Sequence, residues 1–151
     1  MGWLPVMSRD TLEWLLIAFG VSLIVFLMRK NTYQVRYIDS TVYAIAAAIA
    51  TAEGYYVEGS LPRRLNNPGS LKDPITGQLR KFNTADEGWY ALYDQIYRIL
   101  NDKSMYYRSN MTIRQIAQIW TGGDNPEGWA RTVARKLGVS PDTPINQVMV
   151  A

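Results

Sequence analysis

Carboxylates are the side chains of this sequence that could do acid–base chemistry. The chain has 151 residues and contains neither cysteine nor histidine. These absences exclude a thiolate nucleophile, a serine–histidine–aspartate triad and the commonest zinc ligands. Lysine, tyrosine, aspartate and glutamate remain as proton donors and acceptors, so an enzyme with this sequence is expected to work through an Asp or a Glu.

Glu53 is the carboxylate that the sequence singles out. Residues 40–54 read STVYAIAAAIATAEG, an alanine-rich stretch that predicts a helix ended by Gly54. Ile38, Val42, Ile45 and Ile49 form an apolar stripe at helical spacing, which begins just before this helix. Glu53 continues this stripe at the end of the helix. Burial and the negative end of the helix dipole would both raise its pKa, and a protonated carboxyl can protonate the leaving oxygen of a glycosidic bond. The alternative is a glutamate turned to solvent at the helix end.

Aromatic and polar side chains near Glu53 could bind a sugar. Tyrosine rings offer flat apolar faces on which sugar rings pack, and Asn and Arg side chains hydrogen-bond polar or acidic substituents. The Asn-Asn-Pro-Gly sequence also fits a turn without chemistry, and Trp89 and Trp120 are expected to be core residues. The candidate substrate-binding residues are Tyr55, Tyr56, Arg63, Asn66, Asn67, Tyr90 and Tyr93.

Helix start and stop signals indicate the elements that position these residues. Thr-x-x-Glu at residues 84–87 and Thr-x-x-Gln at 112–115 are capping boxes, and Asn-Pro at 125–126 is a third helix start. Residues 55–83 are rich in Gly, Pro and Asn, which predicts a long loop or a small β-hairpin. The pattern predicts one mainly α domain over residues 40–151.

An apolar segment precedes this domain. Trp14–Met28 contains no charged residue and is followed directly by Arg29 and Lys30. A helix that also includes the residues from Thr11 would be about 27 Å long, close to the thickness of a bilayer core. We therefore expect a tail and a single transmembrane anchor in residues 1–30 and a linker in 31–39. Basic residues follow the anchor, which predicts a domain on the cytoplasmic side.

Several short motifs together resemble a known family. They are residues 52–55 (AEGY), 59–60 (GS), 66–71 (NNPGSL), 82–84 (FNT) and 87–89 (EGW). In this combination they resemble the lysozyme-like lytic transglycosylase domains of bacterial and phage proteins. The resemblance extends over roughly residues 38–146, which is nearly the whole domain.

The resemblance implies a lysozyme-like fold in which Glu53 is both general acid and general base. It implies cleavage of the bond between N-acetylmuramic acid and N-acetylglucosamine, without a metal or cofactor. In the transglycosylase branch the muramic C6 hydroxyl attacks and forms an anhydro sugar, so a second carboxylate is unnecessary. Glu58 departs from the family pattern. It is either a second carboxylate for hydrolysis or, as we expect, a residue that faces solvent.

The predicted topology and the implied substrate disagree, because peptidoglycan lies outside the cytoplasm. A phage protein would resolve this conflict: it is inserted from the host cytoplasm, packaged, and meets the wall only during genome entry. The expected localisation is therefore a single-pass protein of a virion membrane or ejection apparatus, in the host inner membrane during assembly. The expected partners are a peptidoglycan glycan strand, a lipid bilayer through Trp14–Met28, and other virion or envelope proteins.

Two other functions fit parts of the sequence. The chain could be a catalytically silent structural or wall-binding membrane protein that keeps the fold. Residues 112–137 could form a helix-turn-helix that reads nucleic acid. The second helix of that unit offers few base-reading side chains beyond Arg131, Arg135 and Lys136, so no specific nucleic acid is expected. The net charge of +3 does not decide between these functions.

Overall fold

The computed structural model describes residues 40–149. The chain divides into two units, Met1–Tyr37 and Ile38–Ala151, and the described residues belong to the second. The predicted anchor and linker lie outside the described residues. None of the helices formed by the described residues combines the length and the apolar character that crossing a membrane requires.

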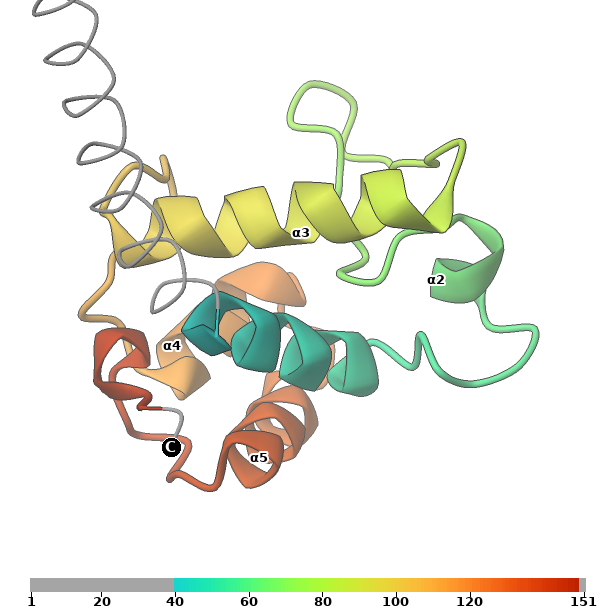
Figure 1. Ribbon diagram of the computed structural model, residues 1–151. Coiled ribbons are helices and arrows are strands. Elements are labelled where there is room, and N and C mark those ends of the chain that lie inside the picture. Colours follow the sequence, from blue (N-terminus) through green and yellow to red (C-terminus); the bar gives the residue numbers. More distant parts are fainter. Residues whose placement is uncertain (1–39, 150–151) are drawn as a thin grey trace, which may run out of the picture. The chain divides into compact units, whose positions relative to one another are not determined.

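The described part of the chain is mainly α-helical, as predicted (Figure 1). Residues 40–52 form its first helix. The helices that follow are α2 (Leu61–Arg64), α3 (Ala85–Leu100), α4 (Ile113–Trp120), α5 (Pro126–Leu137) and the 3₁₀ turn η1 (Ile145–Gln147). Helix α3 runs alongside helix 40–52, and α4 and α5 pack against each other.

The three predicted helix starts are confirmed. The Thr112 hydroxyl accepts from the Gln115 N–H, and the Gln115 side chain accepts from the Thr112 N–H, so both bonds of this capping box form. At the start of α5 the Asn125 side chain accepts from the Gly128 N–H. At the start of α3 the Thr84 hydroxyl accepts from the Glu87 N–H, but the Glu87 carboxylate accepts from the Asn83 N–H instead of the Thr84 N–H, so only half of this predicted capping box forms.

The predicted hairpin is reduced to a single antiparallel bridge between Lys72 and Leu79. We call residues 70–80 the ribbon. Its base is fixed by Asn67, which is completely buried: its Nδ2 donates to Leu71 O and Arg80 O, both at 2.9 Å, and its Oδ1 accepts from the Leu71 N–H at 2.8 Å. One side chain thus satisfies backbone groups on both arms of the ribbon.

A close backbone contact joins the loop before the ribbon to α3. A Cβ built on Gly88 would lie 1.7 Å from Asn66 O, so only glycine permits this approach. Aliphatic side chains of the helices fill the core beneath this contact. The large, almost completely buried ones are Ile45, Leu92, Ile96, Ile113 and Val133.

Candidate active site

Backbone hydrogen bonds fix Glu53 at the end of helix 40–52. The Gly54 N–H donates to Thr51 O at 3.1 Å, and the Tyr55 N–H donates to Ala50 O at 2.9 Å. Gly54 has a φ of 75°. These features make a Schellman motif, in which a left-handed glycine ends the helix. Glu53 is therefore the last residue before the turn, at the end that carries the negative part of the helix dipole.

Helix α5 supplies a hydrogen-bond donor to the Glu53 carboxylate. Trp129 Nε1 donates to Glu53 Oε1 at 2.8 Å, although the two residues are 76 positions apart. The Trp120 ring lies 5.8 Å from that of Trp129, and its own Nε1 donates to Gly69 O at 3.0 Å. The two indoles thus connect α4 and α5 to the carboxylate and to the loop before the ribbon.

A cleft of about 560 Å³ opens at Glu53. The end of helix 40–52, the ribbon, the α4–α5 connection and the first turns of α5 contribute to its walls. Its size falls in the range of about 300–1,000 Å³ that is usual for small-molecule sites. Its lining includes Glu53, Ser70, Lys72, Trp120, Asp124 and Trp129.

Burial raises the pKa of the Glu53 carboxyl above its ordinary value of 4.5. Hydrogen bonds from the side chains of Ser70 and Trp129 and the positive charge of Lys72 lower this pKa, but burial is the larger influence. The negative charge of Glu53 also reaches Tyr107, whose pKa rises to about 12, chiefly through burial. A carboxyl that keeps its proton to higher pH is suited to donate it to a leaving oxygen.

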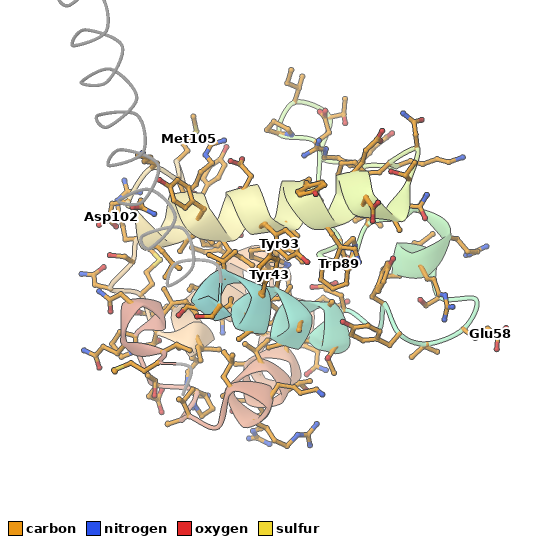
Figure 2. All side chains as sticks on the ribbon, viewed as in Figure 1. Tyr43, Glu58, Trp89, Tyr93, Asp102 and Met105 are labelled. Atoms are coloured by element: carbon orange, nitrogen blue, oxygen red, sulfur yellow. The ribbon has the colours of Figure 1, made fainter. Side chains whose placement is uncertain are left out.

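The four predicted sugar-binding tyrosines lie together, but none of them lines the cleft. Tyr93 contacts Trp89 and Tyr90, with ring centroids 5.8 and 6.3 Å apart, and Trp89 contacts Tyr55 at 5.5 Å. Tyr55 in turn contacts Tyr56. Figure 2 shows Trp89 and Tyr93, together with Tyr43, between helix 40–52 and α3. Tyr56 and Tyr90 are exposed, so this tyrosine cluster has an accessible face.

The polar side chains that were predicted to bind a sugar do not lie together at the cleft. Asn66 and Asn67 use their side-chain amides inside the loop, and Asn66 Nδ2 donates to Phe82 O at 3.1 Å. Arg63 is exposed on α2 and does not line the cleft. Glu58 is exposed, points away from the domain in Figure 2 and also lies outside the cleft. The carboxylate that shares the cleft with Glu53 is Asp124.

Sequence reasoning missed most of the cleft. Ser70, Lys72 and Asp124 lie in loops whose course depends on contacts with distant segments. The sequence around each of them therefore did not indicate that it lines the cleft. Trp129 did carry a signal. A buried indole requires an acceptor for its N–H, and Glu53 was the carboxylate expected to be buried.

No cluster of acidic residues suited to hold a metal ion occurs in residues 40–149. Comparison of the chain with known protein families, with characterised proteins and with solved structures found no match.

Proposed function

We propose that this protein is a membrane-anchored enzyme that cleaves peptidoglycan between N-acetylmuramic acid and N-acetylglucosamine. The observation that carries the proposal is Glu53. It is a partly buried carboxyl with a raised pKa, held by the Trp129 indole at the wall of a cleft of about 560 Å³. Such an acid can protonate a glycosidic oxygen at a pH at which exposed carboxyls are ionised.

The reaction would begin with transfer of the Glu53 proton to the glycosidic oxygen as the bond from that oxygen to the muramic C1 breaks. The resulting Glu53 carboxylate would then take the proton of the muramic C6 hydroxyl, whose oxygen bonds to C1. Glu53 thereby regains its proton, and the product carries a 1,6-anhydro ring. If water attacks instead, a reducing end is formed. The family resemblance and the arrangement around Glu53 support a lysozyme-like fold for the domain.

The proposed setting is a phage virion membrane or ejection apparatus, where the enzyme would open the wall locally during genome entry. The apolar segment Trp14–Met28 and the basic residues after it support this setting. The domain would then be made in the host cytoplasm and meet peptidoglycan only when the virion enters the next cell.

The test is digestion of purified peptidoglycan by the full chain in mild detergent, with the Glu53→Gln variant beside it. Gln keeps the oxygen that accepts from Trp129 but has no acidic proton to give, so activity should fall by about 10²-fold or more. Glu58→Gln is the matched control, because it removes an exposed carboxylate outside the cleft. Anhydromuramyl ends in the mass spectra of the products would identify the transglycosylase reaction.

Wild-type protein that releases no fragments from walls of several chemical types would overturn the proposal. A structural or wall-binding role would then be the better explanation of the fold. Activity that survives in Glu53→Gln would instead remove Glu53 from the reaction.

A further inference from the structure

Lys72 is the one cationic side chain among the described residues that line the cleft. Its backbone belongs to the ribbon, where it pairs with Leu79. Its ammonium group reaches toward the turn that follows α4. The Nζ lies 3.8 Å from the position that a Cβ on Gly122 would occupy. The side chain therefore extends from one wall of the cleft toward another.

Within residues 40–149 no carboxylate forms an ion pair with Lys72. The ion pairs there join Arg98 to Asp94, Arg114 to Glu127 and Asp142, and Arg131 to Glu127. Asp124 lines the same cleft as Lys72 but makes no ion pair with it. The positive charge of Lys72 influences Glu53 electrostatically, without an ion pair between the two side chains. An ammonium group in this position has three donors and no anionic partner.

We propose that Lys72 binds a carboxylate of the glycan, so that the cleft selects acidic over neutral saccharides. The proposal rests on the proposed function and adds the chemical class of the bound group. In peptidoglycan such a carboxylate has two sources. One is the lactyl group of muramic acid, which is free once the peptide stem has been removed. The other is the peptide stem itself.

The test measures binding without cleavage, in full-length Glu53→Gln protein held in detergent micelles. Calorimetric titrations use three ligands: a neutral N-acetylglucosamine oligomer, a muramyl glycan stripped of its stems, and the same glycan with stems. Each is repeated with Lys72→Met added. Lys81→Met is the matched control, because Lys81 is an exposed cation next to the ribbon that does not line the cleft.

Lys72→Met should weaken binding of a carboxylate-bearing glycan by about tenfold, as expected for loss of one charge-assisted hydrogen bond. Binding of the neutral oligomer and all binding by the Lys81→Met protein should stay unchanged. A loss seen with the stripped glycan assigns the lactyl carboxylate, and a loss seen only with the stem-bearing glycan assigns the stem. Higher salt should weaken the same contact.

Equal affinity of the Lys72→Met and parent proteins for all three ligands would overturn the role of Lys72 and leave the proposed function intact. An equal loss for neutral and acidic ligands would also overturn it, because the effect would then not be electrostatic. If the Glu53→Gln protein binds none of the three ligands, both proposals fail. Lys72 is exposed, so unchanged thermal unfolding of Lys72→Met is the check on folding.

Discussion

At the scale of single residues, the surroundings of Glu53 have opposing effects on the pKa of its carboxyl. Burial favours the protonated carboxyl, whereas the Trp129 N–H and the Lys72 charge favour the carboxylate. A residue with this balance can give up a proton and take it back within one catalytic cycle. In the proposed reaction Trp129 would be a positioning residue, since it would act through its hydrogen bond to Glu53.

Trp129→Phe tests this role, because it removes the N–H donor and keeps an aromatic ring. Loss of a bond that stabilises the carboxylate should raise the pKa of Glu53. The descending, high-pH side of the activity profile should therefore move to higher pH. The smaller ring also leaves a cavity and should lower stability by about 1–3 kcal/mol.

The measurement is the pH dependence of kcat/KM on solubilised glycan. Trp89→Phe is the control, since Trp89 lies in the tyrosine cluster and not in the cleft. A profile of Trp129→Phe that coincides with that of the wild type would show that the indole N–H does not tune the acid.

At the scale of elements, the loop before the ribbon holds the ribbon in place at the wall of the cleft. The buried Asn67 amide joins both arms of the ribbon, and the ribbon carries Ser70 and Lys72 into the cleft. Replacing Asn67 with Ala leaves two carbonyls and one N–H without this partner. We expect stability to fall by about 2–4 kcal/mol.

Chemical unfolding of Asn67→Ala beside Asn110→Ala measures this loss, because Asn110 is exposed and serves as the control. The glycan affinity of Asn67→Ala should fall as well, since the ribbon loses its fixed position. A stability within about 0.5 kcal/mol of wild type, the usual range for surface substitutions, would contradict the role given to Asn67.

Local signals explain which elements could be predicted. The caps at Thr112 and Asn125 and the glycine at residue 54 act over a few residues, so sequence spacing predicted them correctly. The ribbon and the cleft depend on contacts between distant segments. Sequence reasoning therefore proposed Asn67 as a sugar ligand, whereas its amide is used inside the loop, and it could not place Trp129 against Glu53.

At the scale of the whole molecule, the apolar segment Trp14–Met28 would decide where the domain works. Val21→Arg places a charge at the middle of this segment. The expected cost at the centre of a membrane helix is about 2.5–3.5 kcal/mol. We expect the variant to leave the membrane fraction in vesicle flotation, whereas the conservative Val21→Leu stays. Flotation of both variants alike would contradict a membrane-spanning role.

Carboxyls whose pKa values shift in opposite directions contribute to the pH dependence of stability. Hydrogen bonds or ion pairs lower the pKa of four other carboxyls, Asp73, Asp102, Glu127 and Asp142. The stability that they contribute is lost as pH falls. Glu53 has a raised pKa instead, so its contribution is fully present below about pH 4.5 and is lost as pH rises through its folded pKa.

Comparing wild type with Glu53→Gln isolates this second contribution, because the four carboxyls with lowered pKa values are common to both proteins. Above the folded pKa of Glu53 the wild type holds an ionised carboxylate in this partly buried position and the variant holds a neutral amide. The variant should therefore be the more stable protein near neutral pH, and its advantage should shrink as pH falls toward 4.5. Thermal unfolding of both proteins across this range measures the difference. A difference that stays constant with pH would mean that Glu53 titrates alike in the folded and unfolded chain, and the cleft would then lack the proton donor on which the proposed reaction depends.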